Sequence, residues 1–247
     1  MSILDLMLAK KSYKELDLNT HISLKNKYVF FQVSKVASST VKDFLQNMEV
    51  KGTSRRVIDV NNRYVSPHIW PSQLNESDFL SIIDDDSFNK ISFVRNPYAR
   101  ILSCYLHRIV KDVSSPSNKW LSKYTGGLCG PNISFSDFAQ VISEQESIQQ
   151  ESHWRRQSDE IFYNIIKNWC FIGRFESLSQ DLNKVQLIIN GNNTSSQESK
   201  LSGKDNFSPM TTKASSKLNE YYDDKTQELI YNSYLSDFKN FGYSKEL

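Results

Sequence analysis

The fold is decided by the stretch Lys27-Tyr28-Val29-Phe30-Phe31-Gln32-Val33-Ser34-Lys35-Val36-Ala37-Ser38-Ser39-Thr40. Its aromatic and β-branched residues over 28–33 predict a short buried strand. A turn with one lysine and three consecutive hydroxyls follows, and an amphipathic pattern over 41–48 predicts a helix. A strand that delivers a helix N-terminus beside a lysine favours an anion site, because free backbone N–H groups and the helix dipole point the same way.

The composition indicates one globular domain without a general affinity for nucleic acid. The chain has 247 residues, of which 38% are hydrophobic, and 30 basic residues against 28 acidic ones give a net charge of +2. With charges so nearly balanced, any binding of anions has to be local. The three cysteines are far apart and form no CxxC pair, so neither a disulfide framework nor a metal site is expected.

No segment of the chain predicts insertion into a membrane. The longest apolar runs fall well short of the roughly 20 residues that span a bilayer. The first residues lack a signal-peptide pattern, because the apolar run over 3–9 is short and contains Asp5. We therefore expect a soluble cytoplasmic protein, although a lumenal domain trimmed of a membrane anchor would have the same composition.

Strand and helix signals alternate along the chain. Further strands are predicted at 55–60, 90–95 and 169–175, and the predicted helices cover 2–18, 97–109, 135–143, 177–189 and 218–241. This alternation favours an α/β fold with a central parallel β-sheet that is flanked by helices.

A second motif, Phe93-Val94-Arg95-Asn96-Pro97-Tyr98-Ala99-Arg100-Ile101-Leu102-Ser103-Cys104-Tyr105, follows the strand at 90–95. Asn96 and Pro97 are typical of the N-cap and first position of a helix. Arg95 at the strand end and Ser103 in the helix together suit a phosphate monoester. Singly, they are also consistent with a salt bridge and a packing residue. The first turn alone is equally consistent with a hydroxyl-rich helix cap, since it lacks the glycines of GxxxxGK[ST].

Together the two motifs resemble the donor-binding motifs of sulfotransferases that use 3′-phosphoadenosine 5′-phosphosulfate. The second motif is similar to the branch that sulfates carbohydrates. Supporting stretches at 153–157, 171–181 and 221–243 extend the resemblance over about 27–243. The resemblance implies a P-loop-like sulfotransferase fold and a single domain over 1–247. It places the donor-binding core at about 27–110 and 165–190, and acceptor or lid elements at about 111–160 and 191–247.

The resemblance also implies roles for the motif residues. Lys35 would stabilise the charge that develops on the bridging oxygen of the donor, and Arg95 with Ser103 would hold its 3′-phosphate. The product would be adenosine 3′,5′-bisphosphate, and no metal is expected. The 5′-phosphosulfate would lie on the turn, which consists of Lys35, Val36, Ala37, Ser38, Ser39 and Thr40.

A histidine is expected to accept the proton of the acceptor hydroxyl, because histidine titrates near neutral pH. His68 lies between two prolines, and related enzymes place a catalytic histidine between their two donor motifs. His153 is the alternative base. His68 is also consistent with a loop histidine packed on Trp70. We expect Trp70, His153 and Arg155 to bind the acceptor.

The predicted activity is in-line transfer of a sulfuryl group to an acceptor hydroxyl on a carbohydrate or glycoconjugate. Two alternatives remain at this point. One is an ATP-dependent small-molecule kinase with a P-loop-like turn, and the other is an inactive protein that binds the donor or its bisphosphate product.

Overall fold

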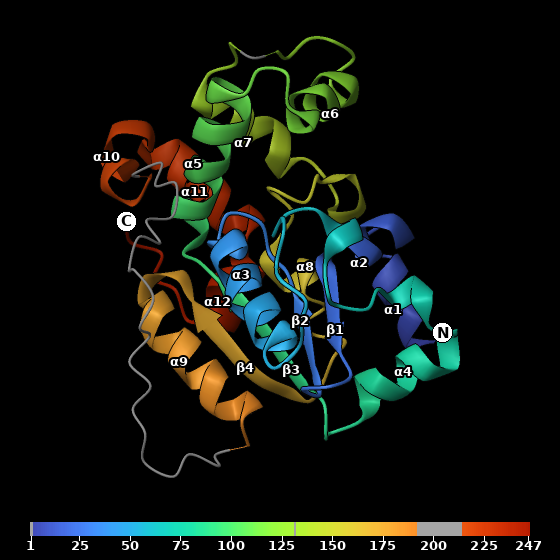
Figure 1. The fold of residues 1–247 in the computed structure, drawn as a ribbon. Helices are drawn as coiled ribbons and strands as arrows, with labels where there is room; N and C mark the ends of the chain where they lie inside the picture. Colours follow the sequence, from blue (N-terminus) through green and yellow to red (C-terminus); the bar gives the residue numbers. More distant parts are fainter. Residues whose placement is uncertain (1, 131, 192–213) are drawn as a thin grey trace.

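The computed structural model describes residues 2–130, 132–191 and 214–247. Its sheet contains β1 (Thr20–Ser23), β2 (Tyr28–Phe31), β3 (Asn89–Val94) and β4 (Trp169–Arg174), in that spatial order. β2, β3 and β4 are parallel, while β1 pairs antiparallel with β2 along one edge (Figure 1). The predicted α/β class with a central, mostly parallel sheet is confirmed.

Several local predictions differ from the structure, and the helix predicted over 218–241 is divided into three. Residues 2–18 form two short helices, α1 (Ile3–Leu8) and α2 (Tyr13–Asn19), and the polar strand β1 directly after them gave no strand signal. The strand predicted at 55–60 is wrong. That segment forms no strand, and 84% of Ile58 is exposed, because its apolar residues find no neighbouring strand or core.

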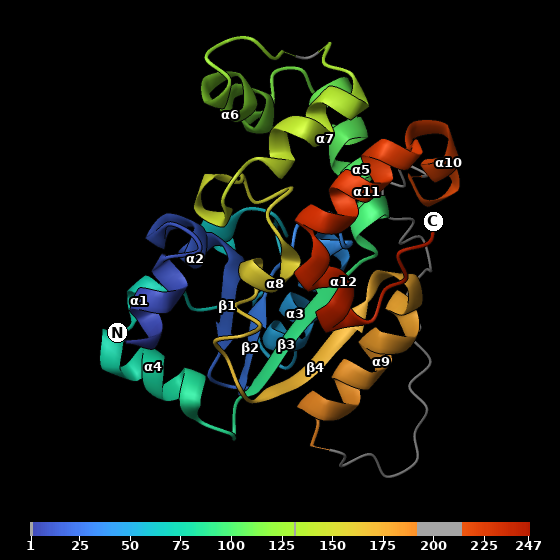
Figure 2. The ribbon, with the colours of Figure 1, turned by 180° about the vertical axis from the view of Figure 1, so that it is seen from behind.

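Helices cover both faces of the sheet. α3 (Ser38–Val50) lies in front of the strands in Figure 1, and α8 (Gln157–Glu160) and α12 (Leu235–Phe241) cover the opposite face in Figure 2. Short 3-10 turns join several elements. The other helices are α4 (Glu76–Asp84), α5 (Pro97–Cys104), the π-helix η3 (Tyr105–Lys111), α6 (Pro116–Tyr124), α7 (Phe135–Ser143), α9 (Leu178–Ile189), α10 (Leu218–Tyr221) and α11 (Asp224–Ser233).

Two hydrophobic clusters hold the elements together. One surrounds the sheet and includes Phe30 and Phe93, and the other joins α5, α7, α11 and α12 through residues such as Trp154 and Tyr234. The second cluster lies beyond the carboxyl ends of β2–β4, on the side where the Lys35 turn emerges (Figure 1). Of the predicted acceptor or lid element at about 191–247, residues 192–213 lie outside the described part of the chain. None of the described helices has the length and apolar character needed to cross a membrane.

Candidate active site

The turn between β2 and α3 has a backbone shaped for an anion. Lys35 and Ala37 have positive φ angles, 70° and 61°, which L-residues adopt at a cost of about 1–2 kcal/mol each. α3 begins at Ser38, and its N-cap residue Ala37 provides no side-chain cap. Ser38, Ser39 and Thr40 therefore form the first turn of the helix rather than capping it. Such alternation of left- and right-handed residues is typical of backbone concavities that bind anions.

Lys35 lies in a strongly cationic environment. Burial lowers its pKa to about 8, and the charges of Arg108, Arg95 and Arg100 act in the same direction, while the nearby Cys104 thiol opposes them. None of the ion pairs found within the described residues involves Lys35. The turn is therefore a concentration of positive charge that an anionic ligand would stabilise.

Arg95 extends from the end of β3 to the same turn, so the structure brings the two predicted motifs together. Its Nη1 donates to the Lys35 carbonyl oxygen at 3.2 Å, and its Nη2 donates to Ser215 Oγ at 3.2 Å. The guanidinium also lies 4.1 Å from the centre of the Phe175 ring. Its buried Nε has no hydrogen-bond partner among the described residues, which leaves one donor for a ligand. Ser103 is buried and lies near the end of α5, the helix that begins two residues after Arg95.

Arg100 holds the Lys35 turn in place through hydrogen bonds, a role that was not predicted from the sequence. It is fully buried in α5, and its Nε donates to the Ser34 carbonyl oxygen at 2.9 Å. Its Nη1 and Nη2 donate to the carbonyl oxygens of Arg155 and Ser152, at 2.9 and 3.3 Å. One guanidinium thus joins the Lys35 turn to the segment that contains His153.

His153 lies in a polar cluster beside the turn. Its Nδ1 is 2.8 Å from Glu151 Oε1, and Arg108 Nε donates to its Nε2 at 3.1 Å. The neighbouring His107 has a pKa lowered to about 4, first by burial and then by the charges of Lys35, Arg108 and His153. These shared interactions place Lys35 and His153 in one electrostatic neighbourhood. The partners Glu151 and Arg108 were not singled out from the sequence, because nothing local marks them.

The structure does not bring His68 to the Lys35 turn. Only 3% of His68 is exposed, and its Nε2 lies 2.6 Å from the hydroxyl of Tyr28, the first residue of β2. Lys35 follows the opposite end of that strand. Burial, with a smaller contribution from the Arg63 charge, lowers the pKa of His68 to about 3. This setting is that of a neutral interior histidine and does not support the predicted role as base.

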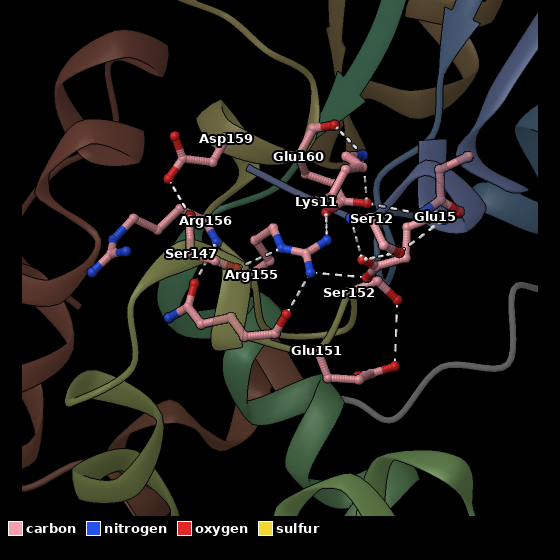
Figure 3. Close-up of polar contacts among 12 residues, drawn as sticks. Lys11, Ser12, Glu15, Ser147, Glu151, Ser152, Arg155, Arg156, Asp159 and Glu160 are labelled. Atoms are coloured by element: carbon pink, nitrogen blue, oxygen red, sulfur yellow. Dashed lines mark hydrogen bonds and ion pairs between the residues drawn. The ribbon is translucent and has the colours of Figure 1, made fainter. Parts of the chain in front are cut away.

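Arg155 and Trp70 also differ from the expected acceptor contacts. The Arg155 guanidinium is 1% exposed and is bound by the Glu160 and Glu15 carboxylates at 3.0 and 2.8 Å (Figure 3). With its donors used inside the protein, Arg155 has a structural role and does not reach an acceptor here. Trp70 is half-buried, and its ring lies 5.0 Å from the Arg63 guanidinium.

The chain is similar to known proteins over most of its length. No solved structure matches the chain. Carbohydrate sulfotransferase 9 of Homo sapiens is 23% identical over 244 residues, which cover 91% of this chain and 53% of that protein. The chain therefore spans about half the length of this curated relative. The pattern of the sulfotransferase family matches residues 19–244, from β1 to the residues after α12. Because this match covers nearly the whole chain, the chain belongs to the sulfotransferase family.

Proposed function

We propose that the chain transfers a sulfuryl group from 3′-phosphoadenosine 5′-phosphosulfate to a hydroxyl group of a carbohydrate or glycoconjugate. The observation that carries the proposal is the contact between Arg95 and the carbonyl oxygen of Lys35. It joins the Arg95 guanidinium to the backbone of the Lys35 turn, beyond the ends of two adjacent parallel strands and beside the uncapped start of α3. The carbohydrate acceptor rests on the similarity to carbohydrate sulfotransferase 9.

The residues of the turn suit this chemistry. In the reaction, the bond between sulfur and the bridging oxygen breaks, a bond from sulfur to the acceptor oxygen forms, and the hydroxyl proton passes to a base. The Lys35 ammonium would stabilise the negative charge on the departing phosphate. The backbone of Val36 and Ala37 and the first turn of α3 would hold the 5′ end. Arg95 and Ser103 would hold the 3′-phosphate, which distinguishes this donor from ATP.

We assign the base to His153 in preference to His68. Arg100 connects the carbonyl oxygens of Ser34 and Ser152, which are the immediate neighbours of Lys35 and His153. Glu151 accepts a hydrogen bond from Nδ1 and so orients the ring, which leaves Nε2 to take the proton. Nε2 now accepts from Arg108, so Arg108 would exchange this contact for the acceptor or the donor when they bind.

Nucleotide binding tests the donor assignment. Adenosine 3′,5′-bisphosphate is expected to raise the melting temperature much more than AMP or ATP at equal concentration, because only the bisphosphate has a 3′-phosphate for Arg95. At 100 times its Kd it would add about 2.7 kcal/mol to the free energy of unfolding. Differential scanning fluorimetry measures the shift. Equal shifts with AMP would remove the 3′-phosphate site, and a larger shift with ATP would favour a kinase.

Replacing His153 and His68 by alanine, one at a time, tests which of them is the base. His153→Ala is expected to reduce kcat by a factor of about 10²–10⁴, with the bisphosphate-induced melting shift unchanged. His68→Ala is expected to keep kcat per folded molecule but to lose about 1–3 kcal/mol of stability, since it leaves the buried Tyr28 hydroxyl with one contact fewer. Single-turnover assays and urea denaturation measure the two effects. The reverse pattern would return the role of base to His68.

A further inference from the structure

A polar cavity of about 140 Å³ lies beside the donor turn and has no role in the function proposed above. It opens between α3, the end of β2 and the segment 60–66. Its lining is mostly polar and is formed by residues that include Asn19, His21, Gln32, Lys42, Asn61 and Arg63, with Leu18 and Val60 as apolar neighbours. Its volume exceeds that of a few water molecules and is enough for one substituent of a sugar ring together with part of the ring.

His21 is one of the lining residues, and its buried Nδ1 is an unused hydrogen-bond acceptor among the described residues. A chain of hydrogen bonds fixes its tautomer. The Glu160 carboxylate accepts from Asn19 Nδ2 at 2.9 Å, and Asn19 Oδ1 accepts from Gln32 Nε2 at 3.5 Å. Gln32 Oε1, 3.2 Å away, must then accept from His21 Nε2. His21 Nδ1 is left with a lone pair and has no partner in the described residues, although only 2% of the residue is exposed. A hydroxyl group is a suitable donor to it.

Lys42 contributes a buried positive charge that forms no ion pair within the described residues, although the Asp59 carboxylate acts on it from a greater distance. Only 8% of Lys42 is exposed, and its ammonium donates to Asn61 Oδ1 at 3.0 Å. No ion pair in the described part of the chain includes Lys42 or the neighbouring Arg63. The Arg63 guanidinium donates only to backbone carbonyl oxygens. Because buried charges are normally paired, two buried cations beside one cavity favour an anionic ligand.

One side chain links this cavity to the donor turn. Asn61 Oδ1 accepts from Lys42 Nζ and also from the hydroxyl of Ser39, at 2.9 Å. Ser39 belongs to the first turn of α3, where the 5′ end of the donor is proposed to lie. A ligand in the cavity would therefore lie next to the transferred group.

We propose that this cavity binds an acidic sugar of the acceptor, with its carboxylate or sulfate on Lys42 and one of its hydroxyl groups donating to His21 Nδ1. The inference rests on the proposed function, because it assumes that the adjacent turn holds the sulfuryl donor. It adds a class of acceptor, a glycan that carries negative charge, and two residues that select it. Neither residue belongs to the donor-binding motifs.

The test uses the chain saturated with adenosine 3′,5′-bisphosphate, so that added anions cannot occupy the two phosphate positions of the donor site. Glucuronate and glucose 6-sulfate are titrated as acidic probes, and glucose is the neutral probe. We expect both acidic probes to bind the wild-type protein at least about tenfold more tightly than glucose, because charge-assisted hydrogen bonds exceed neutral ones by more than 1 kcal/mol. Isothermal calorimetry measures the three dissociation constants.

Variants then locate the binding site. Lys42→Gln is expected to lower the affinity for both acidic probes about tenfold or more, while the exposed control Lys51→Gln leaves both affinities unchanged. Equal binding of glucose and the acidic probes, or full binding by Lys42→Gln, would overturn the inference. The increase in melting temperature caused by the bisphosphate distinguishes this failure from a failure of the proposed function. If the bisphosphate stabilises the protein and the acidic probes do not bind, only the cavity assignment falls.

Discussion

Replacing Lys35 by alanine is expected to reduce kcat by a factor of about 10²–10³, the usual effect of removing one group that stabilises charge in a transition state. The expectation follows from position, since Lys35 lies in the strained turn at the start of α3 and has no carboxylate partner among the described residues. Steady-state kinetics with a labelled sulfate donor measure the effect. The exposed Lys111 provides the matched control, and Lys111→Ala is expected to keep kcat within about twofold.

The pH dependence gives this prediction a second, independent readout. Burial and the surrounding arginines lower the pKa of Lys35 to about 8. Lys35 is therefore charged below that pH in the free enzyme and becomes neutral above it, so kcat/KM should fall as the pH rises through about 8. In Lys35→Ala this alkaline limb should disappear. A variant that keeps both the wild-type rate and the alkaline limb would remove Lys35 from the mechanism.

The Lys35 turn and the position of Arg95 beside it could be predicted from the sequence because their signals are local. A buried strand, a turn and a helix start follow one another within about 15 residues in each motif, and parallel strands bring such turns to the same edge of a sheet. The contact between Arg95 and the Lys35 carbonyl oxygen bears out this placement. The family assignment rested on the same two stretches, and it is confirmed.

The depth at which a side chain is buried, and its contacts with distant parts of the chain, could not be predicted in this way. The number of residues between the first motif and His68 does not predict how far from the Lys35 turn the side chain of His68 packs. The structure shows that it packs against Tyr28, at the other end of β2. Arg155 was taken for an acceptor residue because it lies in one cationic stretch with His153, whereas its partner Glu15 lies 140 residues earlier. The clamp formed by Arg100 likewise depends on three carbonyl oxygens from two distant segments.

The largest effect on stability is expected at Glu160, which lies at the centre of a buried ion network (Figure 3). Its carboxylate lies 3.0 Å from both Lys11 Nζ and Arg155 Nη1, and all three side chains are 1% exposed. Glu160→Ala leaves two cations buried without this counter-charge, which typically costs about 3–5 kcal/mol. Urea denaturation measures the loss. The control Glu15→Ala removes a partly exposed carboxylate that has one contact to Arg155 and completes the capping box of α2 with Ser12, so its cost should remain at about 1–2 kcal/mol.

The decrease in the free energy of unfolding at acid pH distinguishes a lost ion network from a simple packing defect. Burial alone would raise the pKa of Glu160, but Lys11 and Arg155 outweigh it and hold the pKa below its usual value. The group therefore contributes stability above the unfolded pKa of about 4.5, and this contribution is lost as the pH falls towards the lowered folded pKa. Glu160→Ala should consequently lose less stability between pH 7 and pH 3 than the wild-type protein does. Parallel curves for the two proteins would mean that Glu160 stabilises the fold through packing and not through its charge.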